Sequence, residues 1–581
     1  MSLEAVKRNV VGDGAEPGEE KSQLKSAATL MVEMARDKYH LGVSEAGEAF
    51  AEPKSGLPRV FLLRGGQVSL RKQLARTYFN ERGKAAGQQA LSDALTTLDG
   101  FAQEVTPRRL YQRVGQRNGT IWIDLGDDKG RAIRVERGDW SIVSVPGVLF
   151  KRTALTSALP YPARDGDLDE LWRFVNVTPE DRAPILAYLV ASLLPDIPHP
   201  VLGIFGQQGS AKTSTVRVLV ALVDPSPVPY RRPPRDADAW VTTAAGSWMV
   251  ALDNLSTIPQ WLADLLSRAV TGEGDVRRKL YTDGDLHVFA LRRVIALTGI
   301  DLGSLPGDLA DRLLPITLDV IAEEDRRDET SLRTAWEKAH PRILGALLDL
   351  AANVLAHLPH VHLPRMPRMA DYARVLAAVD AVLGTDGLGR YLGAQGRLAH
   401  DTLSGDSFIT SVMEAITTDF EGTAADLLHL ATPADAKWRK PKGWPSTARV
   451  ATQDLRKQAP VLRKAGWHVS DDGGRNKRNA TQWRLIRPTR EAAADSGSPS
   501  LLSLPARQGR DKRGKSADES ACALPRLPRP SSPFLALPRL ESAVQDATTS
   551  QARKASQDPV SPLACGASSS VANLKRVDRD H

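Results

Sequence analysis

A lysine, a threonine and an aspartate have the side chains that bind phosphate and magnesium in proteins. Lys212 and Thr213 follow a loop of mostly small residues, GQQGSA, at positions 206–211, and Asp253 ends the apolar run SWMVALD. A lysine in this place contacts the outer phosphates of a nucleotide, while a threonine hydroxyl and an acid at a strand end suit Mg²⁺. These residues form a nucleotide site if the fold brings them together.

The loop stands between an expected strand, Val201 to Phe205, and a helix expected to begin at Lys212. Small residues let backbone N–H groups close on phosphate, and the helix N-terminus adds partial positive charge. Ala211 takes the place of the second glycine in the pattern G-x-x-x-x-G-K-[ST]. A structural turn with a chance Lys-Thr is the alternative. We expect the whole loop to bind nucleotide: Gly206, Gln207, Gln208, Gly209, Ser210, Ala211, Lys212, Thr213 and Ser214.

Residues after the loop complete a candidate catalytic set. Asp253 lies at the carboxyl end of an expected buried strand, where ligands bind in an open parallel sheet, although an aspartate that caps a strand is the alternative. Asn254 follows where many NTPases of this kind carry an acid, and asparagine orients water but is a poor base. Thr298 ends another expected strand, and Arg312 precedes the last one. The sequence thus assigns catalysis to Lys212, Asp253, Asn254, Thr298 and Arg312, and Mg²⁺ to Thr213 and Asp253.

The composition predicts a globular centre with polar ends. The 581 residues are 42% hydrophobic and 25% charged, which suggests three to five domains. There is no run of ~18 apolar residues that would predict a membrane span, and the first residues lack the apolar core of a signal peptide. The two cysteines, Cys522 and Cys565, lie in the tail, which excludes a disulfide framework elsewhere. We therefore expect a cytoplasmic protein without a membrane partner.

The chain divides by pattern into several regions. Alternating runs separated by turn signals such as Asn118-Gly119 predict a small antiparallel sheet, whereas 201–320 alternates strands and helices, as parallel sheets do. The tail repeats Leu-Pro-Arg without sustained periodicity, at 524–526, 527–529 and 537–539. We expect disorder at 1–22, a helical region at 23–105, a small antiparallel β region at 106–155, a helical lead-in at 156–200, an α/β P-loop core at 201–325, a helical lid at 326–404, a winged helix at 405–490 and a disordered tail at 491–581.

Positive charge is concentrated near the end of the expected folded part. Lys437 to Arg490 holds 15 Lys/Arg against three Asp, an excess of 12, whereas the whole chain has a net charge of +8. Such a basic module on a nearly neutral body indicates nucleic acid, although a protein-binding winged domain is the alternative. Trp467 and Trp483 flank the expected hairpin and should pack as a cross-strand pair rather than stack on bases. The expected DNA contacts are Arg456 and Lys457 on the helix, and Arg475, Lys477 and Arg478 at the hairpin tip.

The order of these motifs resembles the superfamily 3 helicases within the AAA+ ATPases, particularly primase–helicase-like proteins of phages and mobile elements. The resemblance covers about 106–488 and is strongest at 201–320, where TGEGDVRRKLYTDGDLHVFALRRVIALTG has the family's Gly-acid turn, basic strand, hairpin and sensor strand. It implies a homo-oligomeric ring with ATP and Mg²⁺ between subunits, single-stranded DNA in the pore and duplex DNA at the winged helix. By resemblance, Arg277, Arg278 and Lys279 face the pore, and Arg312 acts on the neighbour's nucleotide. A solvated charge run and a structural arginine are the respective alternatives.

Three positions depart from that family. Ala211 replaces a glycine, Asn254 replaces an acid for which Glu273 or Asp275 would have to substitute, and Thr298 replaces the usual asparagine. Two functions therefore stay open. One is an ATP-hydrolysing DNA helicase that serves replication of a phage or an integrated element. The other is a nucleotide-switched DNA-binding or loading protein with little hydrolysis or unwinding.

Overall fold

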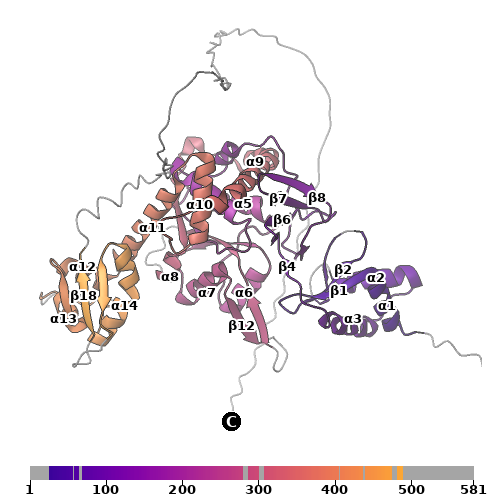
Figure 1. The fold of residues 1–581 in the computed structure, drawn as a ribbon, viewed down its shortest axis with the longest axis horizontal. Coiled ribbons are helices and arrows are strands. Elements are labelled where there is room, and N and C mark those ends of the chain that lie inside the picture. The colour runs from indigo at the N-terminus through magenta and orange to yellow at the C-terminus, as the bar shows by residue number, and fades with distance from the viewer. Residues whose placement is uncertain are drawn as a thin grey trace, which may run out of the picture. The chain divides into compact units, whose positions relative to one another are not determined.

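The structure is a computed structural model of the chain (Figure 1). It describes residues 25–56, 58–64, 69–278, 286–299, 307–404, 406–435, 439–441, 443–473 and 481–487, without the side chains of 274–278, 286–290, 307, 399–404 and 464. The two ends for which the sequence predicts disorder, 1–22 and 491–581, lie outside the described residues. The described part is a mixed α/β protein.

A four-stranded parallel sheet carries the residues expected to bind phosphate. Its strands are β10 (Val201–Phe205), β11 (Met249–Leu255), β14 (Val294–Gly299) and β15 (Leu313–Thr317), in the order β11-β14-β10-β15. Each neighbouring pair is parallel. The carboxyl ends of all four strands consequently meet at one edge, which is where open parallel sheets bind ligands.

Helices cover both faces of this sheet because its residues alternate between two apolar clusters. Leu202 and Ile204 pack in one cluster with α4 (Pro179–Ala191), α5 (Lys212–Val223), α9 (Glu329–His357) and α10 (Ala370–Leu383). Val201, which points to the opposite face, packs in the other cluster with α6 (Ala237–Ala245) and α7 (Gln260–Thr271). A parallel sheet buried on both faces explains why its strands read as continuous apolar runs in the sequence.

Residues 110–150 form a separate antiparallel sheet, β5 (Val114–Arg117), β6 (Thr120–Asp124), β7 (Ala132–Glu136) and β8 (Asp139–Val143), in that order. The short strands β4 (Leu110–Tyr111) and β9 (Leu149–Phe150) pair with each other. Arg113, whose side chain is 1% exposed, forms an ion pair with Asp224 at 2.9 Å, and Asp224 also accepts from the N–H groups of Trp248 and Met249. This buried pair joins the antiparallel sheet to the residues at the start of β11.

The first described region mixes helices and strands. It contains α1 (Ala27–Lys38), α2 (Leu70–Arg82), α3 (Gln88–Gln103) and a sheet of β1 (Tyr39–Val43), β2 (Ala49–Pro53) and β3 (Phe61–Leu62). The expectation of a helical region missed the hairpin of β1 and β2. The burial of these strands does not alternate, since two and three buried residues stand next to each other, so the period-2 signal of a strand is absent.

The short helix α8 (Gly307–Ala310) lies between β14 and β15 in the chain. The helices that follow the parallel sheet are η2 (Glu323–Asp325), α9, η3 (Leu358–His360), α10 and α11 (Gly387–Ser404). In the described part of the chain, Glu329–His360 is the one helical stretch long and apolar enough to cross a membrane by length and composition, and 61% of its most apolar window is buried inside the protein. Burial of this kind is what a core helix needs, and α9 supplies many residues to the main apolar cluster. The hairpin of β12 (Gly274–Arg278) and β13 (Leu286–Ala290) lies between α7 and β14 in the chain.

The last described region has an apolar cluster of its own. It consists of α12 (Ser407–Ala415), β16 (Phe420–Thr423), α13 (Ala424–Ala431), α14 (Ala448–Lys464), β17 (His468–Asp471) and β18 (Gln482–Ile486), with the antiparallel order β16-β18-β17. Trp467 and Trp483 are 6% and 1% exposed, which confirms that they pack in the core. They are not a cross-strand pair, however, because Trp483 stands opposite Asp471 and Gly422.

Candidate functional site

The loop between β10 and α5 has a backbone that favours small residues. Gly206 and Gly209 have φ angles of 144° and 86°, and a Cβ on Gly206 would lie 2.6 Å from the carbonyl oxygen of Leu318. Ala211, just before α5, has a φ of 62°. The left-handed region costs an alanine about 1–2 kcal/mol, which is the physical reason for the glycine preferred at this position.

Lys212 is folded back across the loop that precedes it. Its Nζ donates to the carbonyl oxygens of Gly206 and Gln207, each at 2.7 Å. Lys212 is also the first residue of α5, so its ammonium group and the free N–H groups of the helix N-terminus lie at the same loop. This arrangement concentrates positive charge and donors where the sequence expects phosphate.

Asp253 lies at the centre of a hydrogen-bond group on the carboxyl edge of the sheet. Its Oδ1 accepts from Thr213 Oγ1 at 3.0 Å and from Thr298 Oγ1 at 2.5 Å, and its Oδ2 lies 3.3 Å from Thr213 Oγ1. Thr298 is 1% exposed on β14, the strand next to β11. Three candidate residues from three separate segments of the sequence are therefore in direct contact.

Asn254 takes part in this group through its backbone. It has a φ of 61°, the ladder between β11 and β14 shifts register between Leu252 and Leu255, and the Asn254 N–H donates to Thr298 Oγ1 at 2.8 Å. Asparagine tolerates the left-handed region better than most residues, which suits it to this irregular strand end. The Asn254 side chain is exposed, and the residue contacts Thr298 through its backbone N–H. This contact holds the strand end in place and does not use the Asn254 side chain.

Arg312 contacts the short helix that precedes it. Its side chain is 6% exposed and forms an ion pair with Asp308, and its Nη1 also donates to the Asp308 carbonyl at 2.9 Å. The backbone carbonyl of Arg312 accepts from Val201 N–H at the start of β10. These contacts match the structural salt bridge that was the alternative for this residue, and action on a neighbouring subunit stays a prediction.

Two residues near the loop were missed by the sequence analysis. Asn176 donates to the carbonyl oxygens of Ser210, at 3.3 Å, and Asp319, at 2.8 Å, and so ties the loop to the segment after β15. The Nη2 of Arg326 lies 3.6 Å from the position that a Cβ on Gly209 would occupy. Both side chains line a cavity of about 1210 Å³ beside the loop. Neither belongs to a sequence motif, because each reaches the loop only through the fold.

The described acidic residues bear on the choice of metal. Among the residues that the structure describes, no three His, Cys, Asp or Glu side chains are grouped so that they could hold a metal ion. Magnesium in nucleotide sites needs no such cage, since one or two side chains and the phosphates bind it. Thr213 and Asp253, which are in contact, fit that pattern.

The residues expected to contact DNA are described only in part. Arg277 and Arg278 lie on β12, opposite His287 and Leu286 of β13, while Lys279 is outside the described residues. Arg456 is half exposed and forms an ion pair with Asp471 at 3.3 Å, and Lys457 is exposed beside it on α14. The tip residues Arg475, Lys477 and Arg478 are outside the described residues.

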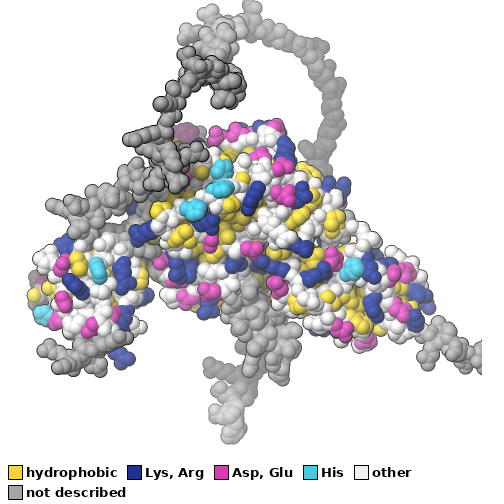
Figure 2. Space-filling model, viewed as in Figure 1, with side chains coloured by type: hydrophobic (Ala, Val, Ile, Leu, Met, Phe, Trp, Pro, Cys, Tyr) yellow, Lys and Arg dark blue, Asp and Glu magenta, His cyan; other side chains and the backbone are white. Residues whose placement is uncertain are grey.

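Among the described residues, the face drawn in Figure 2 has no large continuous patch of Lys and Arg side chains. On the face that Figure 2 draws, Lys and Arg side chains are interspersed with Asp and Glu. Several lysines and arginines of the basic module, including the tip residues, belong to stretches outside the described residues. The 12 excess positive charges of residues 437–490 are thus divided between described and undescribed residues. That the hairpin tip presents some of these charges to DNA stays a prediction.

Comparisons with known structures return distant similarities. The apo C-terminal region of NrS-1 is 13% identical with a TM-score of 0.34 and covers 80% of this chain and all of that one. The X-ray structure of JCV helicase is 13% identical with a TM-score of 0.22 and covers 40% of this chain and 64% of that one. No curated protein matches the chain.

Two family models match the sequence. Residues 168–401, which include the parallel sheet, match the actinomycete integrative conjugative element replication protein, termed AICE RepA. Residues 408–500, which include the last described region, match the AICE RepA C-terminal domain. The two models describe parts of one replication protein and together cover more than half of the 581 residues. The chain therefore belongs to the family of replication proteins of actinomycete integrative conjugative elements.

Proposed function

We propose that this replication protein binds ATP and Mg²⁺ at the loop 206–214 and uses ATP hydrolysis to move along DNA during replication of its element. The observation that carries the proposal is the contact of Thr213 and Thr298 with Asp253 at the carboxyl edge of the parallel sheet. In this proposal the sheet and its helices are a P-loop core of the AAA+ type, as the resemblance to superfamily 3 helicases implies. Its place of action is the cytoplasm, where the element's DNA is copied.

Each residue near the loop has a distinct role in this proposal. The loop N–H groups and Lys212 bind the phosphates, and Mg²⁺, when bound, neutralises charge on the transferred phosphoryl group. Thr213 and Asp253 hold the ion, so their mutual hydrogen bond gives way to ligation. Thr298 fixes the Asp253 carboxylate through its own hydroxyl. The cavity beside the loop has room for the base and ribose, and Arg326 brings a positive charge toward the phosphates.

The DNA contacts are proposed for two hairpins. We interpret α12, α13 and α14 with the sheet β16-β18-β17 as a winged helix that binds duplex DNA through α14 and the tip between β17 and β18. The support is the excess of 12 positive charges in this part of the sequence. The β12–β13 hairpin would contact single-stranded DNA in the pore of a ring, and this part of the proposal is supported by the family resemblance alone.

A nucleotide-switched DNA-binding or loading protein is the second candidate. The observation that favours it is Asn254, which stands where an acid would activate water and whose N–H instead supports Thr298. Without a base, bound ATP would be hydrolysed slowly and would act mainly by holding one conformation. Ala211 in a left-handed conformation points the same way, since it departs from the glycine of the common loop pattern.

ATP turnover measured with and without single-stranded DNA distinguishes the two candidates. A helicase should show turnover that rises with single-stranded DNA and should displace a strand from a forked duplex. A switch should bind ATP and DNA with slow turnover that DNA leaves unchanged. Absence of ATP binding in the folded protein would contradict both.

A further inference from the structure

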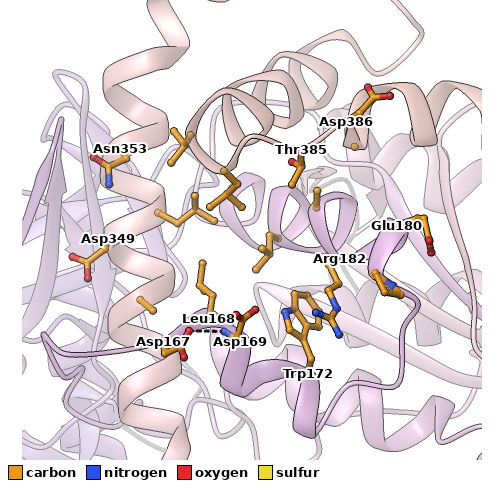
Figure 3. Close-up of a pocket in the computed structure, with 18 of the residues that line it drawn as sticks. Asp167, Leu168, Asp169, Trp172, Glu180, Arg182, Asp349, Asn353, Thr385 and Asp386 are labelled. Carbon is orange, nitrogen blue, oxygen red and sulfur yellow. Dashed lines mark hydrogen bonds between the residues drawn. The ribbon is translucent and has the colours of Figure 1, made fainter. Parts of the chain in front are cut away.

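A second cavity, of about 1030 Å³, lies between η1 (Leu168–Arg173), the first turns of α4, the middle of α9, and the turn from α10 to α11 (Figure 3). Its centre is apolar, with Leu186 and Leu350 buried beneath it. Leu383 stands at its edge with 39% of its surface exposed, which is high for a leucine in a folded protein. The cavity thus offers apolar surface to an occupant.

The walls of this cavity are fixed by buried contacts. Tyr372 on α10 donates its hydroxyl to the carbonyl oxygen of Pro184 on α4 at 2.9 Å. Arg390 on α11 forms two hydrogen bonds with Asp181 on α4, at 2.7 and 3.1 Å. Because both links join neighbouring walls, the cavity is preformed, and an occupant would not have to order it.

Carboxylates surround the apolar centre on several sides in Figure 3. Two guanidinium groups also line the cavity: Arg390 is paired with Asp181, whereas Arg182, which lies over the Trp172 ring at 5.1 Å, keeps its positive charge and offsets one of the five carboxylates. The rim is therefore net negative on a chain whose net charge is +8. It repels nucleic acid and attracts cations. The five acidic residues are Asp167, Asp169, Glu180, Asp349 and Asp386, of which Asp349 already accepts a hydrogen bond from Trp140 Nε1 at 2.7 Å and lies 4.0 Å from Arg164.

The arrangement of these acids argues against a metal ion. In the described part of the chain no three acidic, histidine or cysteine side chains come together closely enough to hold one. Carboxylates spaced around an apolar floor suit several separate cations that are joined by apolar groups. A protein segment with arginine next to leucine has that chemistry, since arginine pairs with carboxylates and leucine fills the floor.

We propose that this acidic pocket is a docking site for a short segment of a partner protein in which arginine and leucine side chains alternate closely. The inference needs no part of the proposed nucleotide chemistry, because the pocket shares no residue with the loop 206–214 and only Trp172 with the cavity beside that loop. A suitable probe is the peptide LPRLPR, whose sequence also occurs at residues 524–529 of this chain.

The test is fluorescence anisotropy of the labelled peptide titrated with the full chain. The unchanged protein should bind it, and binding should weaken as salt is raised. The double variant Asp169→Asn/Glu180→Gln should bind about two- to thirty-fold more weakly, the range expected for two exposed ion pairs. Leu383→Ser should also weaken binding. Glu337→Gln removes an exposed acid of α9 outside the pocket and should change nothing.

Thermal melts of every variant exclude loss of folding as the cause of weaker binding. Equal binding of the peptide LPELPE, or equal loss in the Glu337→Gln control, would overturn the assignment, as would no binding at all at low salt. A full chain with Arg526→Glu and Arg529→Glu that binds the peptide more tightly than the unchanged chain would show that the chain's own tail competes. In that case the chain's own tail, and not a partner protein, would be the occupant of the pocket.

Discussion

Thr298 donates its hydroxyl hydrogen to Asp253 at 2.5 Å and accepts the N–H of Asn254 at 2.8 Å, which joins the ends of two neighbouring strands at the candidate nucleotide site. Thr298 is buried, whereas its partners Asp253 and Asn254 are half-buried and exposed, respectively. A threonine thus orients the carboxylate that the proposal assigns to Mg²⁺. The Thr298 side chain should matter for hydrolysis more than for fold.

Replacing Thr298 by valine keeps its shape and removes the hydroxyl. We expect about ten- to a hundred-fold slower ATP turnover with ATP binding retained, because a hydrogen bond to a charged group contributes about 1.5–3 kcal/mol. Steady-state turnover and equilibrium binding measure the two effects. Thr215→Val is the matched control, since the buried Thr215 Oγ1 has no hydrogen-bond partner. Equal slowing in both variants would remove the role given to Thr298.

Replacing Ala211 by glycine should stabilise the protein. The change relieves a left-handed alanine, which costs about 1–2 kcal/mol. Glycine in turn makes the unfolded chain more flexible, which costs about 0.5–1 kcal/mol of stability, so the net gain is up to about 1.5 kcal/mol. Ala221→Gly, inside α5, should instead cost about 1 kcal/mol. Urea unfolding measures both free energies. A loss of stability in both variants would show that the loop strain is absent.

His199 should make stability depend on pH. Burial lowers its pKa to about 4, whereas an unfolded histidine has a pKa of about 6.5. Between these values the unfolded chain binds a proton that the folded chain does not, so stability falls as pH falls from 6.5 to 4. From pH 7.5 to 5 the loss from His199 should be about 2 kcal/mol. Burial lowers the pKa of His340 to about 4 as well, and this residue adds to the effect.

The change His199→Gln tests this expectation, because glutamine can still donate to the Ala191 and Leu194 carbonyls that His199 Nε2 contacts at 3.0 Å. Urea midpoints at pH 7.5 and 5 should lie closer together in this variant than in the unchanged protein. His357→Gln alters a histidine on the outer side of α9 and serves as the control. Unaltered pH dependence in His199→Gln would show that another group is responsible.

The last described region should bind duplex DNA mainly through phosphates. In the full chain, joint replacement of Arg475, Lys477 and Arg478 by alanine should weaken binding about equally on unrelated sequences, since phosphate contacts carry no sequence information. The slope of log affinity against log salt should become shallower by about 0.9 for each phosphate that the variant no longer neutralises. Replacing the exposed Glu104, Asp128 and Glu337 by the corresponding amides is the control set. If the alanine variant keeps the same affinity for duplex DNA and the same salt slope, the basic tip does not contact the DNA phosphates and must serve another partner.

Local patterns in the sequence were enough to predict the parallel sheet and the loop 206–211 between β10 and α5. The strands around Ile204 and Val250 are buried on both faces and read as apolar runs, and the loop has a motif of its own. The motif prefers glycine at position 211, and glycine is typical of a left-handed (αL) backbone, so the motif also predicts this conformation for Ala211. Contact of Thr298 with Asp253 could be inferred because strand ends converge at one edge of a parallel sheet.

Other features depend on tertiary contacts that leave no local pattern. Asn176 reaches the loop from a segment 34 residues before Ser210, and Arg326 reaches it from beyond β15. The burial of Arg312 and its ion pair with the exposed Asp308 depend on the packed helix α8, which is only four residues long. Strand β16 has four residues and gains its partner β18 from about 60 positions later, so its sequence alone does not distinguish it from a loop.

Equilibrium binding of a fluorescent ATP analogue in the presence of Mg²⁺ tests the central claim most directly. The unchanged protein should bind the analogue, and Lys212→Ala should bind it about ten- to a hundred-fold more weakly because alanine cannot form the charge-assisted hydrogen bond to phosphate. Lys338→Ala removes an exposed lysine of α9 and should bind normally, and thermal melts show that each variant is folded. Equal affinity of the unchanged protein and Lys212→Ala would contradict the account, whereas selective weakening in Lys212→Ala is the result that it predicts.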